Sequence, residues 1–160
     1  MEGFNSFLMM FDTVFSAAEM VDIASPDSKE DQFRRFHAFW CLKEAYLKMT
    51  GEALLADYLT DLEFRDVQVP AAASVLAGTR SAEETSNPSP WGETISSIKV
   101  YRAGVFLPDV RIELQSFEEG YMIGTATPVA GLAETDLKQG LASFKVLDLE
   151  REIKEHQRTQ

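Results

Sequence analysis

The sequence has little of three things that mark well-known classes of protein. Its 160 residues include one cysteine, Cys41, which excludes an internal disulfide. Basic residues are scarce, because 15 Lys and Arg against 26 Asp and Glu give a formal net charge of −11. A general nucleic-acid binder would show a basic face, so this charge argues against that class. No apolar run approaches the roughly 20 residues that cross a bilayer as a helix.

The start of the chain also lacks a secretory signal. Met1-Glu2-Gly3 is not followed by a basic and then an apolar segment. We therefore expect a cytoplasmic protein. The length is sufficient for one domain with a real hydrophobic core, and we predict a single domain over residues 1–160.

Helix signals dominate the first third of the chain. Apolar residues recur at helical spacing over residues 4–15, which predicts an amphipathic helix. Ser16-Ala17-Ala18-Glu19 matches a capping box, which predicts a short helix that ends near Ala24. A long helix should follow, beginning at Ser25-Pro26 or near Ser28, and Gly51 stands where its C-terminal cap belongs.

Strand signals follow the long helix and predict an antiparallel meander. Alternating or β-branched runs indicate strands over 62–67, 95–101, 110–117 and 121–127, with a possible last strand at 144–149. Two segments, near 70–92 and 128–143, have the composition of loose insertions. Helices first and antiparallel strands afterwards indicate the α+β class.

One stripe of the long helix mixes charged and apolar side chains. Residues three and four apart share a helix face, and this face combines an indole, a leucine, a carboxylate and two ammonium groups: Trp40, Lys43, Glu44, Leu47 and Lys48. A core-facing stripe should be apolar. From periodicity alone, the simplest interpretation is a solvated face on which Glu44 and Lys48 form a common and weak i,i+4 pair.

The residue identities point further. Trp40 to Gly51 reads WCLKEAYLKMTG, and this W-x-x-K-E-A-aromatic-x-K-x-x-G pattern resembles the signature helix of the 4′-phosphopantetheinyl transferases. The similarity is greatest to the two-half, surfactin-synthetase-activating type in its fungal form. Flanking segments resemble the same family and extend the similarity over nearly the whole chain: Phe11–Glu19, Glu52–Leu55, Leu62–Arg65 and Phe144–Ile153.

The resemblance implies a reaction and its participants. In this family, the phosphopantetheine arm of coenzyme A is transferred to a serine of an apo acyl or peptidyl carrier protein, with Mg²⁺ as cofactor. By the match, Glu44 is the metal ligand and the base toward the serine, and Lys48 contacts the phosphates. Lys43 matches a further position near coenzyme A. Trp40 is expected to pack and to orient the helix.

One part of the family pattern is not found. The other metal carboxylates of the family lie on a strand reading G-[IVT]-D-[IV]-x before the first helix, and nothing in Met1–Phe15 matches it. The chain therefore resembles the C-terminal half of a two-half transferase, and we expect transfer by this chain alone to be incomplete. The alternatives are a non-catalytic remnant or partner-binding module of the same fold, and, less favoured, an unrelated acidic binding module. An exposed sheet edge could also allow self-association.

Overall fold

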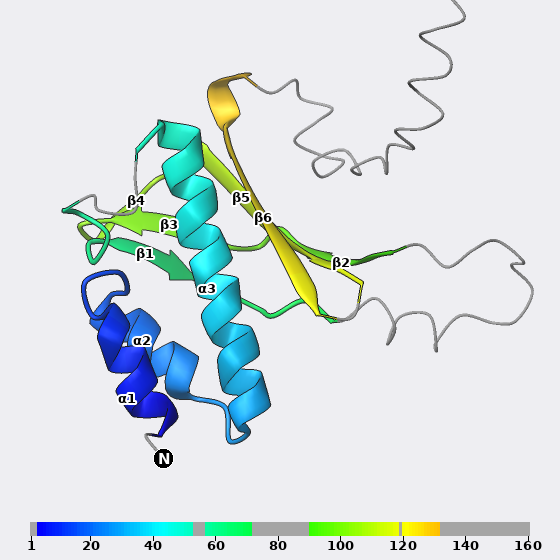
Figure 1. Ribbon diagram of the computed structural model, residues 1–160. Helices are drawn as coiled ribbons and strands as arrows, with labels where there is room; N and C mark the ends of the chain where they lie inside the picture. The colour runs from blue at the N-terminus through cyan, green and yellow to red at the C-terminus, as the bar shows by residue number, and fades with distance from the viewer. Residues whose placement is uncertain (1–2, 53–56, 72–89, 119, 132–160) are drawn as a thin grey trace, which may run out of the picture.

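The computed structural model describes residues 3–52, 57–71, 90–118 and 120–131. Three helices come first: α1 (Phe4–Leu8), α2 (Ala17–Ala24) and α3 (Lys29–Thr50). Six strands follow, and two short 3₁₀ turns complete the described elements: β1 (Leu62–Arg65), β2 (Trp91–Ile95), β3 (Lys99–Arg102), β4 (Val105–Phe106), β5 (Val110–Phe117), β6 (Tyr121–Pro128), η1 (Met9–Phe11) and η2 (Val129–Gly131). Figure 1 shows this order, and it confirms the α+β class.

The helix boundaries follow local capping. Ser16 and Glu19 form the expected capping box, in which the Ser16 hydroxyl accepts from the Glu19 backbone N–H and the Glu19 carboxylate accepts from the Ser16 backbone N–H. Ser28 caps α3 by accepting from the Asp31 backbone N–H at 3.0 Å. Gly51 ends α3 with a φ of 75°, a conformation that glycine adopts without strain.

The first predicted helix is shorter than expected. The apolar spacing over residues 4–15 indicated one continuous helix, but α1 ends at Leu8 and η1 ends at Phe11. The apolar side chains still face the core, since Val14 and Phe15 are buried in the turn before α2. Val14 and Phe15 therefore contribute to the core although they lie outside any regular helix.

The strands form two three-stranded antiparallel sheets, β1-β3-β4 and β2-β5-β6. The stretch 95–101, which the sequence predicted as one strand, is divided between them: Ile95 ends β2 in one sheet and Lys99 begins β3 in the other. Strand β2 begins at Trp91, so the predicted insertion near 70–92 is too long at its end. The remainder of that insertion, most of the 128–143 insertion and the possible strand 144–149 lie outside the described residues.

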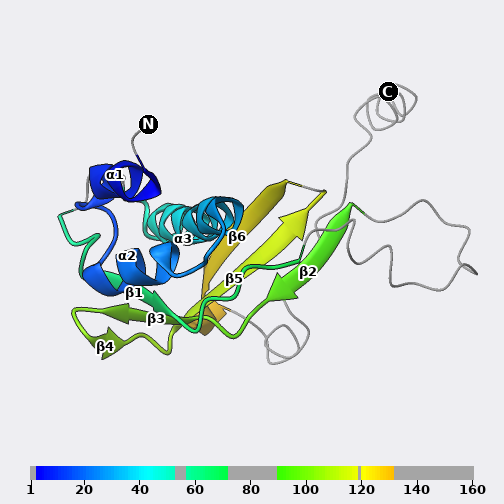
Figure 2. The same cartoon turned by 90° about the horizontal axis from the view of Figure 1, so that it is seen from below.

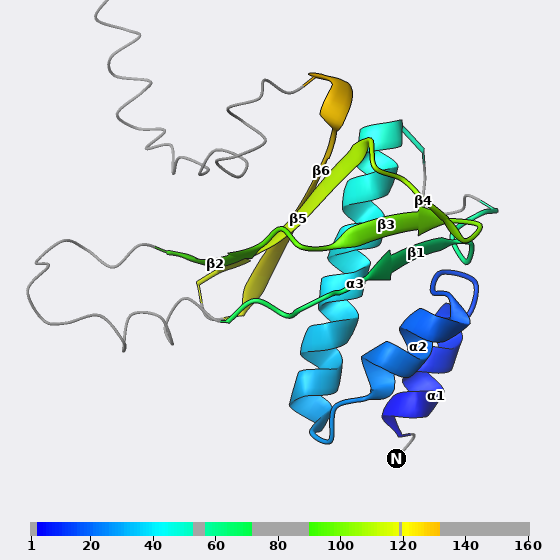
Figure 3. The same ribbon diagram turned by 180° about the vertical axis from the view of Figure 1, so that it is seen from behind.

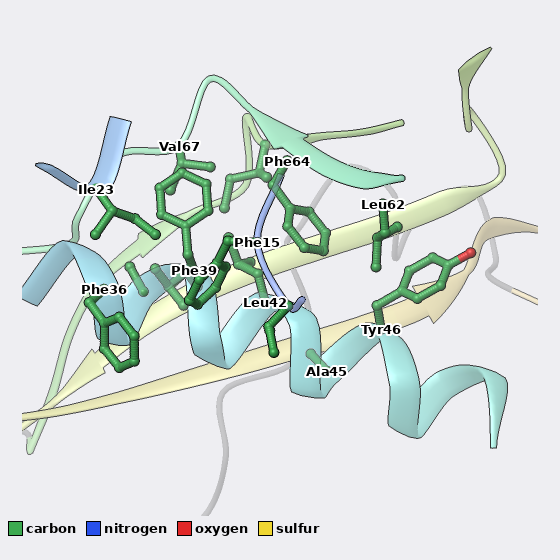
Figure 4. Packing of buried hydrophobic residues seen from close by; sticks show 14 of the residues in the cluster. Phe15, Ile23, Phe36, Phe39, Leu42, Ala45, Tyr46, Leu62, Phe64 and Val67 are labelled. Atoms are coloured by element: carbon green, nitrogen blue, oxygen red, sulfur yellow. The ribbon is translucent and has the colours of Figure 1, made fainter. Parts of the chain in front are cut away.

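Helix α3 crosses both sheets, and α1 and α2 lie beside its first half (Figures 1 and 3). Seen from below, the helices and the strands form two layers (Figure 2). The core lies between these layers and is built from aromatic and aliphatic side chains of both, among them Phe15, Phe39, Leu42, Leu62 and Phe64 (Figure 4). No helix in the described ranges is long and apolar enough to cross a membrane.

The contact between α3 and β6 is unusually close at one glycine. A Cβ placed on Gly124 would lie 2.6 Å from the carbonyl oxygen of Cys41, well inside van der Waals contact. On the same side, the Cys41 thiol donates to the Met122 carbonyl oxygen at 3.6 Å. A residue without a side chain is therefore required where β6 passes over the middle of α3.

Candidate active site on helix α3

The mixed stripe of α3 divides into a buried part and an exposed part. At about 100° per residue, the five side chains of this stripe follow one another around the helix in the order Lys43, Leu47, Trp40, Glu44 and Lys48. Burial falls in the same order: the Lys43 side chain is 0% exposed, that of Glu44 is 31% exposed and that of Lys48 is 78% exposed. The boundary between core and solvent thus runs along this stripe.

Trp40 lies at that boundary and packs, as predicted. Its ring is stacked on Phe36, with 6.1 Å between centroids, and meets the edge of Phe11 at 5.7 Å. These contacts join the signature helix to η1, because Phe11 belongs to η1.

Glu44 and Lys48 project from α3 on its solvent side. The Lys48 ammonium lies 3.7 Å from a Glu44 carboxylate oxygen, as the i,i+4 spacing predicts. Burial raises the pKa of the neighbouring Cys41 thiol; the positive charge of Lys48 opposes this rise and the negative charge of Glu44 adds to it. The region therefore offers one partly exposed carboxylate and one exposed ammonium, which suits a charged ligand that approaches from solvent.

Lys43 lies on the opposite side of that boundary, inside the core. Its ammonium is 2.8 Å from the Glu19 carboxylate and 2.8 Å from the Leu59 carbonyl oxygen, and it also donates to the Leu62 carbonyl oxygen. These three acceptors use all three donors of a lysine. The prediction that Lys43 contacts coenzyme A remains untested, but in this fold its ammonium has three partners within the protein.

Glu19 is satisfied in the same way. Its carboxylate accepts from the Ser16 backbone N–H at 2.9 Å and from the Phe64 backbone N–H at 3.0 Å, in addition to Lys43. Burial raises the pKa of the Glu19 carboxyl and lowers the pKa of the Lys43 ammonium, and in each case the charge of the partner opposes the shift. Among the described residues, no buried side-chain nitrogen or oxygen lacks a hydrogen-bond partner.

This buried pair also occupies the outer edge of β1. The Leu62 carbonyl and the Phe64 N–H are the groups that a further strand would bind on that edge, and Lys43 and Glu19 bind them instead. The sequence predicts an exposed sheet edge without naming its strand, and these two groups of β1 do not provide that edge. Self-association through another sheet edge remains a prediction.

Two hollows lie beside the N-terminal half of α3, away from Glu44 and Lys48. The larger, about 480 Å³, is bounded by Asp31, Arg34 and Arg35 of the helix and by residues 67–71. The smaller, about 170 Å³, lies between Arg34, His37 and the start of β6. Arg34 lines both, and its guanidinium donates to the Pro70 carbonyl oxygen at 2.9 Å between them. Neither Arg34 nor His37 belongs to the signature pattern Trp40–Gly51 from which site residues are predicted.

A metal site built by this part of the protein alone is not found. In the described ranges, no three His, Cys, Asp or Glu side chains come together so that they could hold a metal ion. The Glu44 oxygen is nevertheless the kind of donor that Mg²⁺ prefers. Mg²⁺ is usually bound by one or two carboxylates together with substrate phosphates and waters. Glu44 therefore fits as one ligand of a shared site.

Comparison with known proteins identifies the family. The 4′-phosphopantetheinyl transferase superfamily model matches residues 2–105, which include all three helices and the Trp40–Gly51 pattern. The chain belongs to this superfamily. The unrelated binding module considered above is thereby excluded.

Curated fungal relatives agree with this assignment. The chain is 41% identical to 4′-phosphopantetheinyl transferase A of Aspergillus fumigatus over 134 residues, which cover 77% of this chain and 35% of that protein. It is 38% identical to the 4′-phosphopantetheinyl transferase of Aureobasidium melanogenum, covering 76% of this chain and 32% of that protein. It is 32% identical to 4′-phosphopantetheinyl transferase NpgA of Emericella nidulans, covering 96% and 49% respectively. The chain therefore spans 32–49% of the length of these relatives.

Proposed function

We propose that this chain serves the transfer of 4′-phosphopantetheine from coenzyme A to a serine of an acyl or peptidyl carrier protein. The observation that supports the proposal is the position of Glu44 and Lys48, 3.7 Å apart on the solvent side of the family's signature helix. Both can reach one pyrophosphate, because they lie one turn apart on the same face. The carrier proteins of lysine biosynthesis and of secondary metabolism are the partner class that the resemblance implies.

The proposed roles follow from the charges. Lys48, with its exposed ammonium, would contact the phosphates of coenzyme A and stabilise negative charge that develops there. Glu44 would accept the proton of the carrier serine while the serine oxygen bonds to the β-phosphorus of coenzyme A. The bond between that phosphorus and the bridging oxygen breaks, and 3′,5′-ADP leaves with its electrons. Glu44 would also hold Mg²⁺, which would supply charge neutralisation to the pyrophosphate.

We further propose that the chain alone does not complete the site. Glu44 is one carboxylate, and a single protein carboxylate holds Mg²⁺ weakly because the ion loses its waters reluctantly. Remaining ligands would come from the pyrophosphate, from water and from protein groups outside the described residues. Slow transfer, or none, is expected from this chain by itself.

The test of this proposal uses one substitution and a matched control. Purified chain is incubated with coenzyme A, Mg²⁺ and an apo carrier protein, and the carrier is weighed by mass spectrometry. Glu44→Gln should reduce Mg²⁺-dependent transfer about 10²–10³-fold, the usual cost of removing one group that stabilises a transition state. Glu30→Gln removes an exposed carboxylate at the other end of the same helix and should leave the rate unchanged.

If transfer is too slow to measure, binding replaces it as the observable. Addition of coenzyme A with Mg²⁺ should shift the amide resonances of residues 44–48 in the unsubstituted chain and in Glu30→Gln, and not in Glu44→Gln. Transfer by Glu44→Gln at the unsubstituted rate contradicts the assignment. Absence of both transfer and shifts favours the non-catalytic, partner-binding alternative.

A further inference from the structure

Glu19 and Lys43 form a charged cluster that the proposed reaction does not use. Their side chains are 1% and 0% exposed, and they hold each other at 2.8 Å. The cluster joins three elements, because Glu19 lies in the first turn of α2, Lys43 lies in the middle of α3, and their backbone partners Leu62 and Phe64 belong to β1. The Lys43 ammonium also lies 5.5 Å from the centre of the Phe64 ring.

The charged cluster lies next to the proposed site of Glu44 and Lys48 along α3. Lys43 immediately precedes Glu44, and the two side chains diverge by about 100° around the helix. Sliding or rotating α3 would move Lys43 away from its three oxygen acceptors within an environment that excludes water. Each of those contacts involves a charged group, and charge-assisted hydrogen bonds in such surroundings are the strong ones.

We infer that Glu19 and Lys43 are positioning residues, which fix the rotation and height of α3 so that Glu44 and Lys48 face the substrate. This inference rests on the proposed function for its effect on transfer. It assigns Lys43 a role through Glu44 in place of direct contact with coenzyme A. Glu19 has the same role, although it lies 24 residues before Lys43 and on another helix.

The chain contains its own reporter of the α3 orientation. Cys41 is the sole cysteine, and it lies two residues before Lys43, about 200° away around the helix. Its half-buried thiol faces β6, where it donates to the Met122 carbonyl oxygen. A rotation that releases Lys43 from β1 therefore changes the access of solvent to Cys41.

The experiment compares Glu19→Gln, Lys43→Met and the double variant with Asp22→Asn. Asp22 pairs with Arg35 at 2.6 Å and so also joins α2 to α3, but their side chains are 38% and 21% exposed. The first measurement is the rate at which a thiol reagent modifies Cys41 at a temperature where circular dichroism shows every variant folded. We expect an increase of about tenfold in Glu19→Gln and Lys43→Met, because local opening becomes easier, and less than about twofold in Asp22→Asn.

The second measurement is the kinetics of transfer to the carrier protein. Glu19→Gln and Lys43→Met should lower kcat by similar factors and leave KM for coenzyme A unchanged, and the double variant should be no slower than either single variant, because the two residues act as a unit. A rise in KM for coenzyme A in Lys43→Met alone would show direct contact with coenzyme A and overturn the inference.

The two measurements separate failure of the inference from failure of the proposed function. If the chain neither transfers phosphopantetheine nor shows ligand-induced shifts at residues 44–48, the proposed function fails for this chain, while the Cys41 rates still decide the inference. If the thiol reagent modifies Cys41 in both single variants at the same rate as in Asp22→Asn, the positioning role is wrong. Should Lys43→Met not fold, Glu19→Gln alone carries the test, because glutamine has nearly the shape of glutamate and lies beyond reach of any ligand in solvent.

Discussion

Two lysines of α3 form ion pairs of similar chemistry in opposite surroundings. In the first, Lys43 and Glu19 are fully buried at 2.8 Å, come from different helices and also bind the backbone at β1. In the second, Lys48 and Glu44 lie one turn apart on the same helix at 3.7 Å, and the lysine is 78% exposed. The first pair can fix a structure, because breaking it leaves a charge without water. The second can release its partners to a ligand at little cost.

The difference indicates that two lysines five residues apart can have different roles. In Lys43-Glu44-Ala45-Tyr46-Leu47-Lys48, the two lysines lie at either side of the stripe, one buried and one exposed, and we propose different roles for them. The family pattern records both lysines without distinguishing them. Only the position of the core decides which ammonium is available to a phosphate and which one holds the fold.

The largest expected effect comes from breaking the buried pair. Lys43→Met should lower the free energy of unfolding by about 3–5 kcal/mol, because it leaves Glu19 buried without its counter-charge. The Leu59 and Leu62 carbonyl oxygens lose their donor in the same variant. Urea denaturation followed by circular dichroism measures this change.

A matched variant decides whether the cost arises from burial. Lys48→Met makes the same chemical change five residues later, on the solvent side. If the two variants lose equal stability, the contrast between the pairs is wrong.

The local part of this arrangement could be predicted from the sequence. The S-A-A-E run gave the capping box at Ser16 and Glu19, and the glycine after Thr50 gave the end of α3, because both signals depend on neighbours within a few residues. The second role of Glu19 could not be predicted in this way. Its other partners are 24 and 45 residues away, and only the packing of α2 against α3 and β1 brings them together.

The same limit explains the division of the predicted strand at 95–101. Alternation shows that a segment is extended, but it does not show to which sheet each end belongs. Ile95 and Val100 are both buried, yet they contribute to different sheets. The mixed stripe of α3 is likewise predicted as one face. Helical spacing alone groups Lys43 with Glu44 on that stripe and cannot locate the boundary between core and solvent that separates them.

A second prediction concerns the side of α3 that faces β6. Gly124→Ala would place a Cβ 2.6 Å from the Cys41 carbonyl oxygen, which is backbone and cannot turn aside. The strand must shift, so we expect a loss of about 1–3 kcal/mol in the free energy of unfolding, as for overpacked cores. Gly120→Ala is the control, because nothing lies within 4 Å of the Cβ that it adds.

The Gly124 variant also sharpens the comparison of the two pairs. Thermal unfolding of both glycine variants measures the loss, and equal midpoints would show that β6 and α3 separate without cost. If instead Gly124→Ala destabilises the chain while Lys43 keeps its protection in hydrogen exchange, the buried pair holds α3 independently of β6.

The smallest expected effect is on the exposed pair. Lys48→Ala should change the free energy of unfolding by no more than about 0.5 kcal/mol, because an exposed i,i+4 pair contributes little and alanine is itself a good helix former. Urea denaturation at low and at high salt measures this, and the difference between Lys48→Ala and the unsubstituted chain should shrink further as salt screens the charges. A loss as large as that of Lys43→Met would mean that Lys48 holds the fold as well, and its ammonium would no longer be free for a phosphate. A small loss of stability together with loss of the shifts that coenzyme A induces at residues 44–48 would separate binding from folding on this face of the helix.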